Sequence, residues 1–296
     1  MIIAVVVLSL LPVFDIALMV QGAWQGVIST EIYADSLYYH ARFREIKDGY
    51  PFIGNPFYIE HRADMPPTFF VADWLMSLPF LLGLSLPATL IIDFIFWSLV
   101  FAILGYKIFE ALGLSKKTSA LGALFIYLLC YNIILRPTSY QVVYPVFLLF
   151  IWLLVRWLKH PAARWNYFFL AAAAALCFYT YPFLEQVVLV TLLFYLAVFL
   201  FLKNWTNLKR LLAIGFWALV FSLPLIIFTI KQVSQTYYWE TMFRHGLVQS
   251  HWPTAVVFYA DFWVVAGCFL LGAFRVVIDK KQEKFILADW SPRFFC

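Results

Sequence analysis

The sequence predicts an all-α, polytopic membrane protein with about eight membrane-spanning helices. Of its 296 residues, 64% are hydrophobic and only 12% are charged, whereas soluble domains are about 45–50% apolar and about 25% charged. So few polar side chains cannot cover a globule in water, which excludes a soluble protein. The formal net charge of +5 does not indicate a nucleic-acid partner, because in a membrane protein the placement of Lys and Arg matters more than their sum.

Apolar runs define the predicted spans. A spanning helix needs about 20 mostly apolar residues, and we assign spans to 2–22, 86–109, 118–135, 142–159, 166–181, 186–203, 209–230 and 253–275. The first segment follows no basic stretch, so we predict a retained helix rather than a cleaved signal. A shorter apolar run over 67–83 contains Asp73 and Pro79 and ends at Gly83. We predict a juxtamembrane or re-entrant helix there.

The connections between the spans alternate in charge. Basic residues cluster in four of them: Lys107/Lys116/Lys117, Arg156/Lys159/Arg164, Lys203/Lys209/Arg210 and Arg275/Lys280/Lys281/Lys284. The intervening connections, 24–66, 136–141, 182–185 and 231–252, carry no such cluster. Because basic loops stay in the cytoplasm, we predict a multi-pass protein with a cytoplasmic N-terminus and with loop 24–66 outside.

We predict one membrane domain over 1–296, because no internal repeat or low-complexity tract divides the chain. The sequence ends in an apolar stretch that begins directly after the last basic connection. This pattern is expected of a chain that continues in a longer protein.

The first outer loop contains a short amphipathic helix, predicted from the sequence SLYYHARFREIKDG over 36–49. Tyr39, Phe43 and Ile46 recur at i, i+4 and i+7, which places them on one helix face. Gly49 stands where a residue that ends a helix is expected. We expect the helix to lie on the membrane surface with a solvated basic stripe on another face. That stripe comprises His40, Arg44 and Lys47.

Asp35 precedes this helix at its positive end. Such a carboxylate is either a helix cap or a general base or metal ligand that faces a cavity at membrane level. Glu31 lies four residues earlier, and two neighbouring acids suit a divalent cation such as Mg²⁺ or Mn²⁺. Asp35 is therefore the candidate metal ligand of the chain.

Three further acids, Asp15, Asp93 and Asp261, fall in the outer halves of predicted spans. Ionisable groups within a bilayer are costly and usually face a polar cavity. Their common side favours an outward-opening aqueous pocket, although hydrogen bonds between helices would also explain them.

These features resemble the polytopic C-type (GT-C) glycosyltransferases. The resemblance rests on an apolar first span, an outer loop with an acid before a Tyr-rich helix (ADSLYYHARFREIKDGYPF), and a Pro-Pro start to a juxtamembrane helix (MPPTFFVADWLMSLPFLLGLSLP). Oligosaccharyltransferases, protein O-mannosyltransferases and lipid A aminoarabinose transferases belong to this superfamily. The motifs cover roughly the first 160 residues, and the rest of the chain agrees in topology only.

The resemblance implies an inverting sugar transfer on the extracytoplasmic face from a polyprenyl-phosphate donor. It places the catalytic acid in the first outer loop, where Asp35 matches, and implies a divalent metal in some members. The segment RPTSYQ at 136–141 lacks the acidic pair that other members carry there. The acceptor would be a lipid, a glycan or a protein, and the process would be cell-envelope glycosylation.

Charge chemistry suggests the remaining site residues. Arginine forks onto phosphate and cations stabilise a departing phosphate, so the candidates for binding the donor phosphate are Arg62, Arg136 and Lys231. The secondary candidates are Glu31, Tyr38, Tyr39, His61 and Glu240.

Two other functions remain open. A transporter or flippase for a lipid-linked or anionic solute would place charges near the bilayer midplane and often shows repeated halves, whereas the polar groups here collect in outer loops. A non-catalytic membrane subunit would carry the same apolar composition.

Overall fold

The structure, a computed structural model, describes residues 1–19, 36–52, 70–135, 140–235 and 238–239. The chain divides into two compact units, Met1–Gln235 and Thr236–Cys296, and almost all described residues belong to the first. The described part of the chain contains helices and turns but no strand, which confirms the all-α prediction. The helices are α1 Ile2–Met19, α2 Ser36–Lys47, α3 Val71–Leu81, α4 Leu86–Ala111, α5 Lys116–Leu129, α6 Tyr131–Ile134, α7 Tyr140–Lys159, α8 Arg164–Thr180, α9 Pro182–Phe201 and α10 Trp205–Val233.

Four helices among the described residues, α4, α7, α9 and α10, are long and apolar enough to cross a membrane. They correspond to the predicted spans 86–109, 142–159, 186–203 and 209–230, and they indicate a membrane protein. The helices α1 and α8 are apolar but shorter. The predicted span 253–275 lies outside the described residues.

The predicted span 118–135 is interrupted in the structure. Helix α5 ends at Leu129, and the backbone at Cys130 leaves helical geometry with φ −95° and ψ 6°. The N–H groups of Ile133 and Ile134 both donate to the Cys130 carbonyl, which starts the short helix α6. The segment is therefore two helices rather than one.

The ends of the helices follow local sequence signals. The side chains of Ser85 and Ser115 accept hydrogen bonds from backbone N–H groups in the first turns of α4 and α5, which is the usual role of serine before a helix. Gly49 and Gly83 have φ of +92° and +98° and terminate α2 and α3, because this left-handed backbone is readily available to glycine. Both glycines were predicted as helix ends, and both predictions are confirmed.

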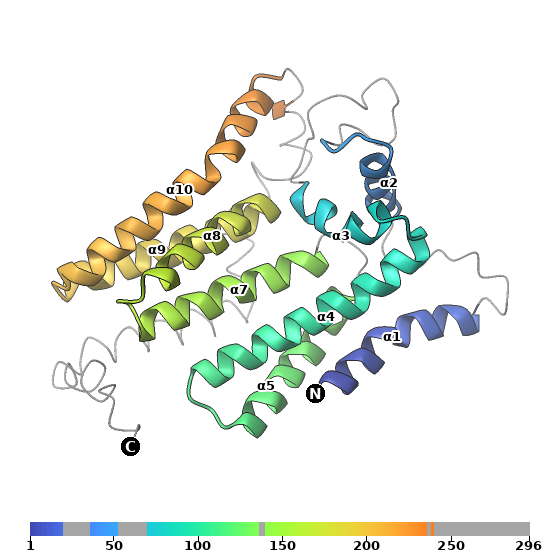
Figure 1. The fold of residues 1–296 in the computed structure, drawn as a ribbon, viewed down its shortest axis with the longest axis horizontal. Helices are drawn as coiled ribbons and strands as arrows, with labels where there is room; N and C mark the ends of the chain where they lie inside the picture. The colour runs from blue at the N-terminus through green and yellow to red at the C-terminus, as the bar shows by residue number, and fades with distance from the viewer. Residues whose placement is uncertain (20–35, 53–69, 136–139, 236–237, 240–296) are drawn as a thin grey trace. The chain divides into compact units, whose positions relative to one another are not determined.

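The helices α1, α4, α7, α8 and α10 lie side by side in this order, each in contact with the next (Figure 1). Helix α5 packs on α4, and α9 packs against both α8 and α10. Helix α3 contacts α2, α4, α7 and α8, so it joins α2 to the row. Ala171, Ala173 and Ala174 of α8 are buried in the largest core cluster, as expected where small side chains permit close helix packing.

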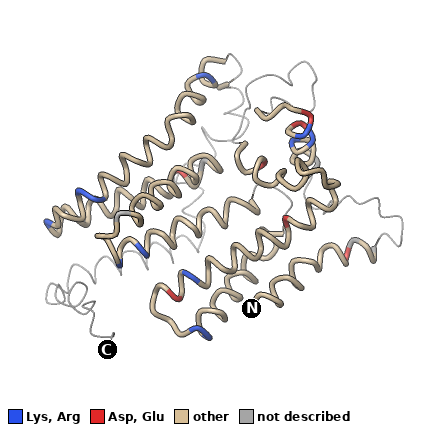
Figure 2. The backbone as a smooth tube through the Cα atoms, in the orientation of Figure 1, with Lys and Arg blue, Asp and Glu red and all other residues tan. Residues whose placement is uncertain are grey.

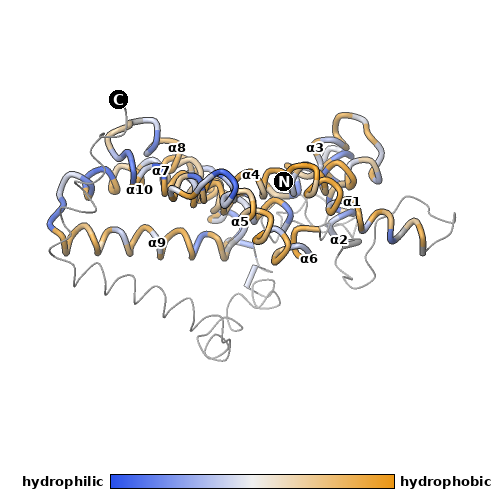
Figure 3. Tube along the Cα trace, turned by 90° about the horizontal axis from the view of Figure 1, so that it is seen from below, coloured by the Kyte–Doolittle hydropathy of each residue, from blue (hydrophilic) through white to orange (hydrophobic). Residues whose placement is uncertain are grey.

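The outward surfaces of the long helices are apolar. Figure 3 shows hydrophobic residues along α9, and only 17% of its span is buried inside the protein, against 50% for the span of α7. Val190, Leu193 and Phe201 of α9 are each about 60% exposed. Large exposed apolar surfaces mark contact with a membrane or a partner, and on a helix of this length the membrane is the direct explanation.

Lys and Arg residues avoid the middles of these helices. Figure 2 shows Lys and Arg gathered towards the ends of α4, α7 and α10. In α7, Arg156 and Lys159 lie in the last turn, and α10 carries Lys231 in its last turn. Basic residues at helix ends reach the polar boundary of a membrane.

Candidate functional site

The structure describes three of the nine predicted site residues. These are Tyr38 and Tyr39 in α2 and Lys231 at the end of α10. The others lie outside the described residues: Glu31, Asp35, His61, Arg62, Arg136 and Glu240. The candidate site is therefore described from the helices that adjoin it.

Helix α2 forms where the sequence predicts it, beginning at Ser36, directly after Asp35. Its apolar face packs on protein. Phe43 is fully buried in the same cluster as Met76 and Phe80 of α3, and Ile46 is buried with Phe70. Phe43 and Ile46 are therefore covered by protein, and the position of the helix at a membrane surface stays a prediction.

A buried ion pair fastens α2 to α3. The Arg42 Nε donates to Asp73 Oδ2 over 2.9 Å, and its Nη2 donates to the same oxygen. The Nη1 atom of Arg42 donates to the Tyr38 hydroxyl over 2.8 Å. The side chains of Arg42 and Asp73 are each only 1% exposed. Tyr38, a predicted secondary site residue, is thus hydrogen-bonded to Arg42, whose salt bridge to Asp73 joins residues 31 positions apart.

Burial alone would lower the pKa of Arg42, but the adjacent Asp73 carboxylate and the Tyr38 hydroxyl raise it above its ordinary value. The guanidinium therefore stays charged in the protein interior. Removing one partner of such a pair leaves an uncompensated buried charge, which typically costs about 3–5 kcal/mol. The orientation of α2 on α3 is consequently strongly specified.

Sequence reasoning missed Arg42. It assigned His40, Arg44 and Lys47 to a solvated stripe, gave Arg42 no role, and treated Asp73 as a feature of the apolar run. The available signal was Asp73 itself, because an acid in the first turn of an otherwise apolar helix requires a buried cation or hydrogen-bond donor.

The predicted basic stripe does not exist as one solvated face. His40 is buried, and among the described residues its Nε2 has no hydrogen-bond partner. The Lys47 ammonium lies 3.9 Å from the centre of the Phe80 ring, a cation–π contact. Arg44, paired with Asp48, and Lys47 are both exposed, so only His40 of the three leaves the solvated surface. The helix differs from the prediction because α3 covers part of the surface assigned to solvent.

Aromatic side chains join this helix pair to α10. Phe228 of α10 lies 5.1 Å from Phe70 and 6.0 Å from Phe52, measured between ring centres. Lys231 is exposed and lies one turn beyond Phe228. Phe70 also packs on Ile46, near the C-terminal end of α2. The last turns of α10, which carry Lys231, therefore lie nearer to that end of α2 than to Tyr38, which is two turns away from Ile46 along the helix. The structure does not bring Lys231 and Tyr38 together.

A group of tyrosines joins α2 to the other outer connections. The hydroxyl groups of Tyr140 and Tyr181 lie 2.9 Å apart, and the ring of Tyr144 lies 6.4 Å from that of Tyr140. Tyr39 of α2 lies close enough to Tyr181 to interact with it electrostatically.

This contact bears on the arrangement of the connections. Tyr140 begins α7, four residues after Arg136, and Tyr181 lies four residues before Glu185. Tyr140 and Tyr181, which adjoin two connections predicted to share one side of the membrane, therefore meet in the structure, and Tyr39 brings α2 close to Tyr181.

Several buried polar groups near the first turns of α4 and α7 have no hydrogen-bond partner in the described part of the protein. They are Thr89 Oγ1, Asp93 Oδ2 and both side-chain amide atoms of Gln141. Buried polar atoms are normally paired with protein or water, so water or a ligand would complete these groups. Of the three acids predicted to face a pocket, Asp93 is buried, Asp15 is exposed and Asp261 lies outside the described residues.

The described residues contain no group of three or more His, Cys, Asp or Glu side chains that could hold a metal ion. The predicted metal ligand, Asp35, lies outside them, so the metal prediction stays a prediction.

A scan against protein-family models and searches of curated proteins and of solved structures each found no match for this chain.

Proposed function

We propose that the protein is an inverting membrane glycosyltransferase that takes a sugar from a polyprenyl-phosphate donor. In this proposal the chain crosses the membrane about eight times, its N-terminus is cytoplasmic, and the loop 24–66 forms the site on the extracytoplasmic face. Asp35 is the general base.

The observation that carries the proposal is the attachment of α2. Asp35 directly precedes this helix, and the Arg42–Asp73 pair fixes the helix on α3. A catalytic group must be held in a defined geometry, and a helix fixed by a buried salt bridge directly after Asp35 in the sequence supports this role. The positive end of α2 also favours an ionised carboxylate at position 35.

The surroundings of α2 suit a polar reaction. Tyr39 lies near Tyr181, which bonds to Tyr140, so α2 adjoins the connection that contains Arg136. The phenols of this group offer hydrogen bonds to the hydroxyl groups of a sugar.

The proposed reaction needs few protein groups. Asp35 removes the proton from the acceptor hydroxyl, the acceptor oxygen forms a bond to the anomeric carbon, and the bond from that carbon to the phosphate oxygen breaks. Arg62, Arg136 and Lys231 are the cations for the departing phosphate. Lys231 lies at the far end of α2 from Tyr38, so we rank it behind the two arginines. A divalent cation on Asp35 would add further charge stabilisation.

The test is Asp35→Asn in the purified chain, with turnover and donor binding measured separately across a panel of polyprenyl-phosphate sugars. A positioned base typically contributes about 10²–10⁴-fold, so we expect turnover to fall by that factor while the donor still binds. Asp48→Asn is the matched control, because it removes an acid from the other end of α2, and its turnover should match that of the wild type.

Unchanged turnover in Asp35→Asn would remove Asp35 from the mechanism. If no donor supports transfer but sealed vesicles that contain the protein accumulate a lipid-linked or anionic solute, the transporter alternative replaces the enzyme. If neither activity appears, the non-catalytic subunit remains.

A further inference from the structure

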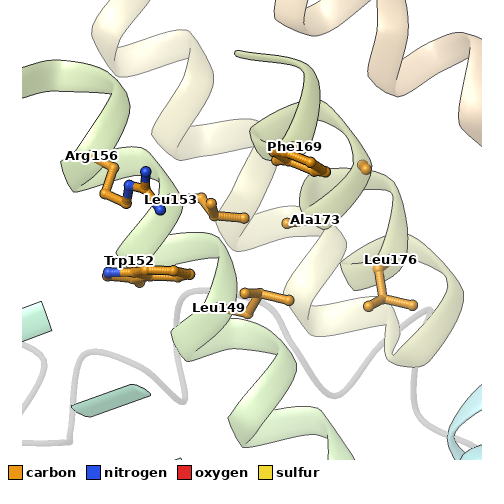
Figure 4. A pocket seen from close by; sticks show the side chains of 8 residues that line it. Leu149, Trp152, Leu153, Arg156, Phe169, Ala173 and Leu176 are labelled. Carbon is orange, nitrogen blue, oxygen red and sulfur yellow. The ribbon is translucent and has the colours of Figure 1, made fainter. Parts of the chain in front are cut away.

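A groove of about 380 Å³ lies between α7 and α8 (Figure 4). Leu149 and Leu153 of α7 and Phe169 and Leu176 of α8 form its apolar walls. Helix α8 contributes small side chains from its alanine run, including Ala172. The groove exists because alanines face the larger side chains of α7 and leave space between the two helices.

The groove contains one charged side chain, Arg156. Its guanidinium carbon lies 5.0 Å from the centre of the Trp152 ring, and Arg156 is exposed. No carboxylate in the described ranges forms a salt bridge with it. The groove therefore presents a cation that is positioned by an aromatic ring and that lacks a described counter-ion.

The cation and the apolar walls lie at different depths. Arg156 stands three residues from the end of α7 at Lys159, where a spanning helix reaches the membrane boundary. The lining continues along α7 to Leu149, seven residues earlier, which is about 10 Å towards the middle of the helix. A ligand that matches this order has an anionic group at the membrane surface and an apolar chain beneath it.

We propose that the groove binds an anionic phospholipid of the surrounding bilayer, with the phosphate on Arg156 and one acyl chain along Leu149, Leu153 and Phe169. Arginine matches phosphate by its forked donors, and basic pockets between membrane helices bind anionic headgroups.

This lipid site is separate from the proposed transfer site. Arg156 lies 16 residues from Tyr140 on the same helix, which is about 24 Å, and α2 approaches the Tyr140 end. The proposal of a lipid site therefore does not depend on Asp35 or on sugar transfer.

The first test titrates the full-length chain, purified in detergent, with phosphatidylglycerol and with phosphatidylcholine of the same acyl composition, and measures bound lipid by native mass spectrometry. One cation near the surface favours an anionic lipid by a factor of about five. We expect this preference in the wild type and its loss in Arg156→Gln. Arg210→Gln should keep it, because Arg210 bonds to Asn207 in α10 and does not line the groove.

The second test addresses the acyl chain. Ala172 is half-buried, so Ala172→Leu adds apolar volume to the groove without replacing a fully buried core residue. We expect it to weaken binding of both lipids about tenfold, the effect of excluding roughly two methylene groups.

Three outcomes overturn the lipid site. They are equal affinity of the wild type for the two lipids, a preference for phosphatidylglycerol that survives in Arg156→Gln, and unchanged binding of both lipids in Ala172→Leu. The last outcome would show that the acyl chain does not lie in the groove.

Discussion

Arg42 and Arg156 differ in their burial and in their partners. Arg42, in the charged helix α2, is 1% exposed and bound to Asp73. Arg156, in the apolar helix α7, is exposed and lies against the Trp152 ring. The most polar of the described helices buries one of its two arginines, whereas a long apolar helix exposes its arginine.

The difference follows from the cost of burying charge. A cation in the protein interior requires a fixed anion and further hydrogen bonds, and Asp73 and Tyr38 supply them to Arg42. A cation at a helix end reaches water or lipid headgroups without a fixed partner. The first arrangement orders helices, and the second leaves a charge available to an external anion.

The strongest test breaks the buried pair. We expect Arg42→Met to lower the free energy of unfolding by about 3–5 kcal/mol, because it leaves the Asp73 carboxylate buried without a cation. Unfolding in detergent, followed by circular dichroism, measures this change. The double variant Arg42→Met/Asp73→Leu should recover most of the loss. A double variant no more stable than the single one would contradict the ion-pair explanation.

A neutral buried pair should cost less than the charged one. Tyr181→Phe removes the hydroxyl that bonds to Tyr140, and we expect a loss of about 0.5–1.5 kcal/mol in the same unfolding measurement. Tyr140→Phe should have a similar effect, and the two changes combined should cost less than their sum. Strict additivity would show that the two hydroxyls do not interact.

A buried base in α2 should make stability depend on pH. Burial lowers the pKa of His40 below its ordinary value of 6.5, so the folded protein keeps the imidazole neutral. The unfolded chain binds a proton near pH 6.5 that the folded chain does not. The contribution of the neutral His40 imidazole to stability is therefore complete above about pH 6.5 and is lost as the pH falls through the folded-state pKa.

Unfolding midpoints between pH 8 and pH 5 test this expectation. The decline at acid pH should be smaller in His40→Gln than in the wild type. His160→Gln is the control, because His160 is exposed at the end of α7. An identical pH profile in His40→Gln and the wild type would exclude a contribution from His40.

The exposed arginines should contribute least to stability. Arg44 pairs with Asp48 at the surface of α2, and exposed pairs of this spacing contribute about 0.3–0.5 kcal/mol. We expect Arg44→Gln and Arg156→Gln to change the free energy of unfolding by no more than about 0.5 kcal/mol. A loss above about 2 kcal/mol in Arg156→Gln would mean that Arg156 orders α7 and α8, as Arg42 orders α2 and α3.

Sequence reasoning predicted the helices better than the site. It located α2 and its end at Gly49, the shorter α3 with its end at Gly83, and the four long apolar helices. It did not predict the interruption at Cys130, because the apolar run continues through that residue. The residues that the prediction placed in the site lie mostly outside the described ranges, and of those described, Tyr39 adjoins the tyrosine group while Lys231 lies at the other end of α2.

Composition, apolar run length and residues such as Gly49 act over a few neighbouring positions, so the membrane class, the all-α fold and most helix boundaries follow from the sequence. The packing of the helices fixes which charges of α2 are buried, that Arg42 meets Asp73, and that Tyr140 meets Tyr181. These pairs join residues 31 and 41 positions apart. Helical periodicity shows which residues share a face, but the partner of that face depends on how the helices pack.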